Sequence, residues 1–387
     1  MADRPKIPSG YSPTARSHEI DILKAVGIIC MVAGHSGAPF SHFIYLFHMA
    51  IFFIASGFFF KDRDSNDLHS LISAIKRKLR QLWLPFVFWH TFFVLMHNLF
   101  LRINIYTDDP DALNYFSNYK MVIVTPYSTS DLIQELIRGA AFRNSELLFG
   151  ATWFLAVLFT VSVSYLIADY VIKKSIRRNL IFVQGILSSL LLGLGYSFQM
   201  DHLEGRGIKR AMIMTASYYC LYFLGHLLSE CKERYRNWDW KKWLPLLIIS
   251  LVILLILNRY GSISLSGHTY VNPAYFLCAS FSGWVLLYSF SCLIMRFTRI
   301  KKYLSSVGKQ TLIIVILHFL SFKIIIFPVV RYFGLPDFCL AAFPNLYGAK
   351  GLLWLVYTIV GIGVPVFVNQ VAHIARVRLV PRLKSQK

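Results

Sequence analysis

The chain has 387 residues, of which 56% are hydrophobic and only 15% charged, whereas soluble domains carry about 25% charged residues. This composition, with a mean hydropathy of +0.53, excludes a disordered chain, a coiled coil and a disulfide-rich secreted module, and it disfavours a soluble enzyme. The net charge of +21 comes from basic clusters between apolar runs, a pattern typical of cytoplasmic loops, and it does not indicate nucleic-acid binding.

Ten apolar runs approach the roughly 20 residues that a helix needs to cross a membrane. They are predicted at residues 19–37, 41–60, 82–101, 147–172, 179–200, 211–229, 243–258, 272–295, 311–330 and 351–372. The sequence therefore predicts an all-α, polytopic integral membrane bundle over 19–372, with an N-terminal tail (1–18) and a basic C-terminal tail (373–387). The polar N-terminal tail lacks an apolar stretch, so we expect the first span to act as the insertion signal.

The basic gaps between these spans alternate with less basic ones. Basic residues concentrate in the N-terminal tail, at 76–80, 173–178, 232–242 and 296–309, and in the C-terminal tail. Because cytoplasmic loops carry an excess of Lys and Arg, both termini are predicted to be cytoplasmic. The exception is 201–210, which places Arg206, Lys209 and Arg210 on the predicted outer side.

The longest gap, 102–146, contains most of the acidic loop residues on the predicted outer side. Within it, residues 131–142 are predicted to form an amphipathic helix, either on the membrane surface or packed against the protein. The six cysteines are scattered without a CxxC pair, so the sequence predicts neither a zinc site nor a disulfide framework.

Ionisable groups inside a span are costly and usually face a partner, a cavity or a substrate path. The first span holds Asp21, Lys24 and His35. Since a helix turns by about 100° per residue, all three share one stripe, with His35 about 16 Å beyond Lys24 along the axis. Asp21 and Lys24 are spaced to pair with each other, and the simpler interpretation of that pair is an ion pair at the membrane interface.

Histidines also occur in other apolar runs. His48 lies in the second span, and the short connection between the first two spans predicts that it lies close to His35. His318 lies deep in the ninth span. His42 is predicted at the solvated rim, and Lys323 is predicted to reach the outer interface.

Several further polar and aromatic residues have structural explanations. His90, His97 and His226 are predicted to be structural. Trp153 fits an aromatic belt, and Ser56–Gly57 offers either a hydroxyl group or a point of close helix packing.

Five segments resemble a known family. The stretches IDILKAVGIICMVAGH (20–35) and FHMAIFFIASGFFF (47–60) resemble the opening of membrane acyltransferase family 3, and are most similar to its fucose 4-O-acetylase-like branch. KRKLRQLWLPFVF (76–88), TWFLAVLF (152–159) and GKQTLIIVILHFL (308–320) extend the resemblance over nearly the whole chain. Lys24 stands where the wider family has Arg, and Ala50 stands where the branch commonly has Pro.

The resemblance implies a multi-pass protein of the bacterial cell membrane. Such a protein transfers an acetyl or other small acyl group from acyl-CoA to a hydroxyl of a polysaccharide, lipid-linked sugar or glycolipid. No permanently bound cofactor and no metal are expected. A transporter of sugars or lipids and a non-catalytic membrane subunit are the alternatives.

The chemistry needs a base, positive charge near the thioester oxygen and basic groups for the CoA phosphates. His35 is predicted to be the base, supported by Asp21 and Lys24, with His48 orienting or polarising. The residues assigned to the acceptor are Trp153, Ser56 and His318, and those assigned to CoA are Lys76, Arg77 and Arg80. Membrane topology alone also explains the basic cluster.

Overall fold

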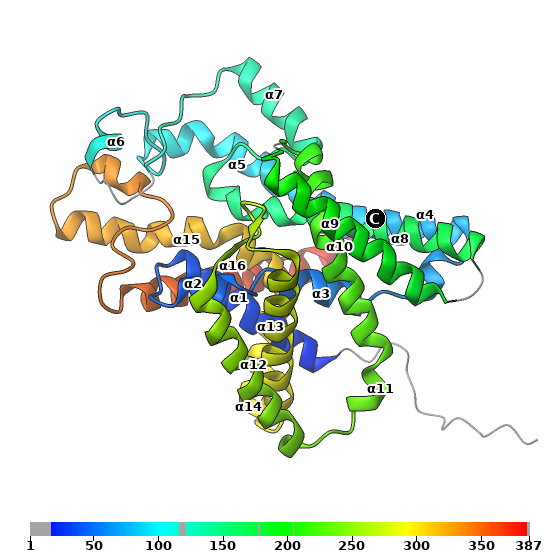
Figure 1. Cartoon of the computed structure of the whole chain (residues 1–387). Coiled ribbons are helices and arrows are strands. Elements are labelled where there is room, and N and C mark those ends of the chain that lie inside the picture. Colours follow the sequence, from blue (N-terminus) through cyan, green and yellow to red (C-terminus); the bar gives the residue numbers. More distant parts are fainter. Residues whose placement is uncertain (1–16, 116–120, 177–178, 204, 385–387) are drawn as a thin grey trace, which may run out of the picture.

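The computed structural model describes residues 17–115, 121–176, 179–203 and 205–384. Within these ranges, nine helical stretches are long and apolar enough to cross a membrane. They are Ser41–Phe58, Leu68–Arg102, Leu147–Ser175, Leu180–Met200, Ile208–Glu230, Trp240–Tyr260, Pro273–Ile294, Thr311–Tyr332 and Leu353–Ala375. The predicted all-α, polytopic membrane fold is therefore confirmed. Figure 1 shows the helices coloured along the chain from blue to red.

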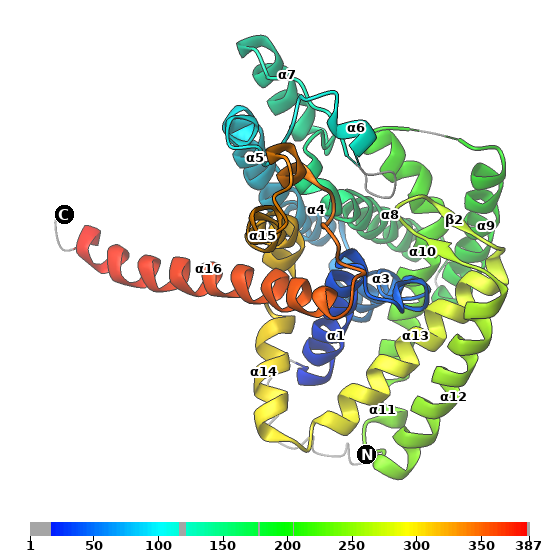
Figure 2. The same cartoon turned by 90° about the vertical axis from the view of Figure 1, so that its left-hand side faces the viewer.

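Helix α1 (His18–His35) is not among these nine stretches, because it carries Glu19, Asp21 and Lys24. It lies inside the bundle and contacts α2, α3 and α13 to α16. Figure 2 shows α1 and α3 near the middle of the molecule, between α15 and α16 on one side and α10 and α13 on the other. Asp21 is therefore buried in the protein, whereas Lys24 and His35 are partly buried.

The second predicted span is interrupted. Its two parts are α2 (Ser41–Tyr45) and α3 (Ala50–Phe58), and the turn between them contains His48. Helix α3 packs closely on α10 (Ile208–Glu230) at Gly57. The approach requires glycine, because a Cβ atom at this position would overlap the carbonyl oxygen of Tyr222. The packing role predicted for Gly57 is confirmed.

The third predicted span (82–101) is the C-terminal part of a longer continuous helix that begins at Leu68. Helix α4 (Leu68–Lys78) continues through a π-helical turn, η2 (Leu79–Trp83), into α5 (Leu84–Arg102). Pro85 follows directly after this π-helical turn, near the start of α5. Single π-helical turns are frequently found at functional sites.

The gap between α5 and α8, predicted to be on the outer side, contains α6 (Ala112–Tyr115), α7 (Thr129–Ala140) and η3 (Leu147–Thr152). Ser128 and Asp131 form a capping box at the start of α7. The predicted helix is confirmed, and it packs along α5 with Glu135 and Gly139 buried (Figure 1). Its opposite face exposes Ile133 and Ile137, so one face of the helix packs on the protein and the other presents apolar side chains.

The remaining elements complete the bundle. They are η1 (Asp62–Ser65), α8 (Trp153–Ser175), α9 (Leu180–Met200), α11 (Lys232–Tyr235), α12 (Trp240–Tyr260), β1 (Ile263–Ser264), β2 (Thr269–Tyr270), α13 (Pro273–Ile294), α14 (Thr298–Gly308), α15 (Thr311–Tyr332), η4 (Asp337–Ala341) and α16 (Leu353–Lys384). The two short strands pair as an antiparallel hairpin, with Ile263 opposite Tyr270. Helix α16 continues past the predicted last span into the predicted C-terminal tail and extends away from the bundle in Figure 2.

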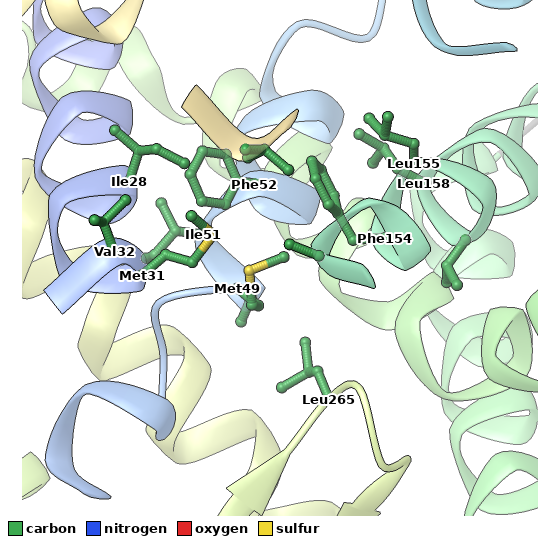
Figure 3. Close-up of a cluster of buried hydrophobic side chains, with 14 of the residues drawn as sticks. Ile28, Met31, Val32, Met49, Ile51, Phe52, Phe154, Leu155, Leu158 and Leu265 are labelled. Carbon is green, nitrogen blue, oxygen red and sulfur yellow. The ribbon is translucent and has the colours of Figure 1, made fainter. Parts of the chain in front are cut away.

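Apolar side chains from α1, α3, α8 and the hairpin meet in one part of the core (Figure 3). The labelled members are Ile28, Met31, Val32, Met49, Ile51, Phe52, Phe154, Leu155, Leu158 and Leu265, all less than a tenth exposed. Inside a membrane such close packing, rather than exclusion of water, holds helices together. Met31, Met49 and Leu265 also line a small polar cavity, so this core fixes the walls of the site described next.

Candidate active site

Three residues assigned to the site from the sequence line one cavity of about 120 Å³. His35 comes from the last turn of α1, His48 from the turn before α3, and Trp153 from the start of α8. The loop of the β1–β2 hairpin closes the cavity with Ser264 and Ser266. The predicted closeness of His35 and His48 agrees with this arrangement.

His318 contacts the His35 ring within hydrogen-bond distance. Nδ1 of His35 lies 3.0 Å from Nε2 of His318. Nδ1 of His318 lies 3.0 Å from the carbonyl oxygen of Ile314 and 2.9 Å from that of Val315. Carbonyl oxygens only accept hydrogen bonds, so Nδ1 of His318 carries the proton and its Nε2 accepts. His35 must then donate through Nδ1, which leaves a lone pair on its own Nε2.

The position of His35 is fixed by its neighbours. The side-chain amide of Asn345 donates to the His35 carbonyl oxygen at 2.8 Å and accepts from the Gly348 amide at 2.9 Å. The ring of Phe319 stacks on His35 with 4.9 Å between centroids. The loop before α16 thereby holds the end of α1 in place.

His48 is fixed in a similar way. Its Nδ1 lies 3.0 Å from the Ile44 carbonyl oxygen, so the neutral ring donates there and keeps a lone pair on Nε2. Two imidazoles that are both hydrogen-bonded through Nδ1 therefore line the same cavity. Such a site can accept protons from hydroxyl groups.

Asp21 and Lys24 lie at the opposite end of α1. Their side chains pair at 3.4 Å, and Ser305 of α14 donates to Asp21 Oδ2 at 3.4 Å. Eleven residues of helix, about 16 Å, separate Lys24 from His35. The structure therefore does not bring the whole predicted stripe into one site.

Ser56 also lies apart from the His35 cavity. Lys78 Nζ donates to the Ser56 hydroxyl at 3.4 Å and stands 5.8 Å from the centre of the Tyr222 ring. The basic residues assigned to CoA are all exposed, and one of them, Arg77, pairs with Asp64.

Lys78 was not singled out from the sequence, although a signal was present. It follows the buried Leu71 and Ala74 at the spacing of one helix face. That spacing predicts a lysine that points into the protein. Lys78 thus belongs with Ser56 and the basic segment.

Lys323 corrects a prediction. It does not reach the outer interface but is buried, and its Nζ donates to the carbonyl oxygens of Leu340 at 2.8 Å and Ala342 at 3.0 Å. These bonds satisfy carbonyl groups of the irregular loop that leads to Asn345. Non-helical backbone inside a membrane protein requires such partners.

His97 belongs to a second buried polar cluster. Its Nδ1 lies 3.1 Å from Glu146 Oε1 and its Nε2 lies 3.0 Å from the Thr125 carbonyl oxygen. Tyr106 donates to Glu146 at 2.9 Å, and burial together with the Glu146 carboxylate raises the pKa of Tyr106 well above its ordinary value. The structural role predicted for His97 fits this cluster, which connects the segment between α5 and α8 to α5.

His226 is part of another network, around Asp62 and Asp169. The Tyr165 hydroxyl lies 2.7 Å from its Nδ1. Three atoms of the kind that binds metal ions, one from each of Asp62, His226 and Glu230, lie within 4.8 Å of one another. Lys173 pairs with Asp169 at 2.8 Å and with Asp62 at 3.5 Å, and so supplies positive charge to these carboxylates.

Most of the chain is similar to one known protein family. Residues 17–371 match the acyltransferase domain that defines acyltransferase family 3. The match covers α1, the hairpin and α15, which together contribute the cavity and the His35–His318 pair. None of the curated proteins matches the chain.

Proposed function

The chain belongs to acyltransferase family 3, and on that premise we propose that it is a membrane O-acyltransferase, in the first instance an O-acetyltransferase. It moves the acyl group of acyl-CoA to a hydroxyl of a polysaccharide, lipid-linked sugar or glycolipid at the bacterial cell membrane. The observation that carries this proposal is His35, whose Nε2 keeps a lone pair because His318 accepts from its Nδ1.

His35 serves as the general base in this proposal. A sugar hydroxyl is a poor nucleophile at neutral pH, so Nε2 of His35 removes its proton as the oxygen attacks the thioester carbonyl. The resulting imidazolium is stabilised by the lone pair of His318. The carbon–sulfur bond then breaks, and His35 returns the proton to the CoA thiolate. An acyl-histidine route would use the same Nε2 as the nucleophile.

The sequence predicted that His48 either orients or polarises a substrate, and we assign it the orienting role. Its neutral ring donates to the Ile44 carbonyl oxygen, so Nε2 can only accept. His48 therefore orients the acceptor by receiving a hydrogen bond from a sugar hydroxyl. Trp153 offers an aromatic wall for the apolar face of that sugar.

The basic segment at the end of α4 and in η2 is proposed to bind the CoA phosphates through Lys76, Arg77 and Arg80. Ser56, which Lys78 of α4 contacts, lies near the C-terminal end of α3. His48 precedes the first turn of α3, roughly 10 Å away along the helix axis. Acyl-CoA bound at the basic segment therefore has to extend its thioester along α3. Asp21 and Lys24, at the far end of α1, are assigned to this donor side.

The test uses the purified protein in lipid nanodiscs. Release of free CoA thiol is measured with and without a glycan acceptor, and surface glycans are compared by mass analysis in cells with and without the gene. We expect acceptor-dependent release of thiol and acylated glycan that is lost without the gene. Movement of a sugar or lipid across the bilayer without any acylated product would contradict the proposal.

A further inference from the structure

The basic segment 201–210, which breaks the predicted alternation of basic and less basic loops, lies close to the proposed site. Arg206, Lys209 and Arg210 stand at or just before the start of α10, beside the β1–β2 hairpin. The guanidinium group of Arg210 donates to the Ser266 carbonyl oxygen, and Ser266 lines the His35 cavity. This cluster therefore lies on the same side of the bundle as the proposed site, whereas outer loops are normally poor in basic residues.

Two cavities adjoin the cluster. One, of about 430 Å³, is lined by residues that include Glu135, Arg143 and Trp153, and the other has about 510 Å³. They share Arg206 and Arg210, and the first shares Trp153 with the His35 cavity. We call the two cavities together the basic groove. Both volumes fall in the range of about 300–1,000 Å³ that is typical of ligand pockets.

The walls of the basic groove match an acidic carbohydrate. Trp153 provides an aromatic face for the C–H groups of a sugar ring. Glu135 is buried and its Oε1 pairs with Arg138, which neutralises the carboxylate, whereas its Oε2 has no hydrogen-bond partner in the described part of the chain. This second oxygen is left to accept a hydrogen bond from a sugar hydroxyl. Arginine side chains in the same walls bind carboxylate or phosphate through paired N–H groups.

His268 adds no positive charge to the groove. Burial and the neighbouring Arg210 lower its pKa below the ordinary value. Its Nε2 lies 2.8 Å from the Ser217 hydroxyl, which gives the neutral ring a partner. The cationic character of the groove therefore comes from its arginine and lysine side chains, whose charge does not change near neutral pH.

We propose that the basic groove binds an anionic group that the acceptor glycan carries next to the acylated sugar. The group is either the phosphate of a lipid-linked sugar or the carboxylate of an acidic polysaccharide. This inference rests on the proposed function, because it names the acceptor of that reaction. It excludes a wholly neutral glycan as the preferred acceptor.

The experiment measures binding without acyl-CoA, on the full chain in nanodiscs of phosphatidylcholine. The probes are a galacturonate hexamer, a polyprenyl phosphoglucose placed in the nanodisc, and neutral maltohexaose. We expect at least one anionic probe to bind more tightly than maltohexaose, with an affinity that falls as salt is added. The anionic probe that binds identifies the source of the charge, and failure of both to exceed maltohexaose overturns the proposal.

The variant Arg206→Gln/Lys209→Gln tests the groove itself. Because hydrogen bonds to charged groups are strong, it should weaken anionic-probe binding by about tenfold or more and leave maltohexaose unaffected. The matched control, Arg299→Gln/Lys302→Gln, removes the same charge from exposed positions of α14 and should change neither. Equal losses in both variants would show a general charge effect and overturn the proposal.

Two further outcomes separate the alternatives. If phosphatidylglycerol added to the nanodisc displaces the anionic probe, the groove holds lipid headgroups and the proposal is wrong. If charge-dependent binding is found but acyl-CoA is never consumed with any acceptor, the proposed function fails while the anion site stands.

Discussion

Nδ1 of His35 lies 3.0 Å from Nε2 of His318, although 283 positions separate the two residues in the chain. The contact joins the last turn of α1 to the middle of α15. Because two backbone carbonyl oxygens occupy Nδ1 of His318, the direction of the hydrogen bond between the rings is fixed. An acceptor that holds one tautomer of a basic histidine is the arrangement that activates the base in acyl-transfer enzymes.

Replacement of His35 by alanine should abolish acyl transfer while the protein still accumulates in the membrane. The loss of a general base typically lowers the rate by about 10²–10⁴-fold. The measurement is thiol release from acyl-CoA by equal amounts of folded protein. A folded His35→Ala protein that transfers acyl groups at the normal rate would disprove the assignment.

His318 should act as a positioning residue. His318→Ala removes the acceptor for His35 Nδ1–H, so the maximal rate should fall with little change in the apparent KM for acyl-CoA. His318→Gln supplies an amide oxygen that can accept the same bond and should recover part of the rate. Equal activity of the alanine and glutamine variants would show that the hydrogen bond is unimportant.

The sequence predicted the membrane helices well, because long apolar runs have few alternatives to a spanning helix. Helices Leu180–Met200 and Pro273–Ile294 agree with their predicted ranges to within one residue at each end. Proximity of His35 and His48 was also predictable, since a short connection leaves adjacent helices side by side. The proximity of residues that are close in the sequence was therefore predicted correctly.

Contacts between distant parts of the chain were not predictable. Nothing local in the sequence indicates that His318 meets His35 or that Lys323 binds loop carbonyl groups instead of reaching the interface. The break in the helix at His48 was missed because the turn is as apolar as the helices around it. Periodicity also placed Asp21 with His35 on one stripe, but a stripe continues along a helix and does not define one site.

His97 should matter for stability rather than for chemistry. It pairs with the buried carboxylate of Glu146, and removal of one partner from a buried ion pair typically costs about 3–5 kcal/mol, of which the remaining Tyr106 hydrogen bond to Glu146 offsets a part. His97→Ala should therefore lower the thermal unfolding temperature in detergent and reduce the yield of protein.

A matched control for this effect is His42→Ala. His42 also makes one close polar contact, 2.7 Å to Asn258, but that contact is exposed. Its loss should leave the unfolding temperature nearly unchanged. An unfolding temperature of His97→Ala equal to that of His42→Ala would argue against a buried ion pair.

Orientation in the membrane follows from the alternation of basic gaps. In a cysteine-free background, His69→Cys should react with a membrane-impermeant thiol reagent only from the cytoplasmic side, and Asp108→Cys only from the outer side. Both positions are exposed, so access of the reagent does not depend on unfolding. The opposite pattern would reverse the predicted orientation, and labelling of both positions from one side would show that the number of spans between them is wrong.

Lys24 should act through its charge. The side chain pairs with Asp21 at 3.4 Å on the α14 side of α1, and a contact at that distance needs a cation but not the planar fork of arginine. Lys24→Arg should retain substantial acyl transfer, and Lys24→Met should lose most of it. Transfer rates and protein yield are measured together, because an uncompensated Asp21 carboxylate also destabilises the fold.

The double variant Lys24→Met/Asp21→Asn separates the two roles open to Lys24. If the lysine only neutralises Asp21, removal of both charges should restore part of the lost activity, since an asparagine side chain still accepts from Ser305. If Lys24 contacts the donor, the double variant should fold but stay nearly inactive, with a raised apparent KM for acyl-CoA in the residual turnover. Full activity of Lys24→Met alone would contradict both roles, and the pair would then serve only to anchor α1 at the membrane interface.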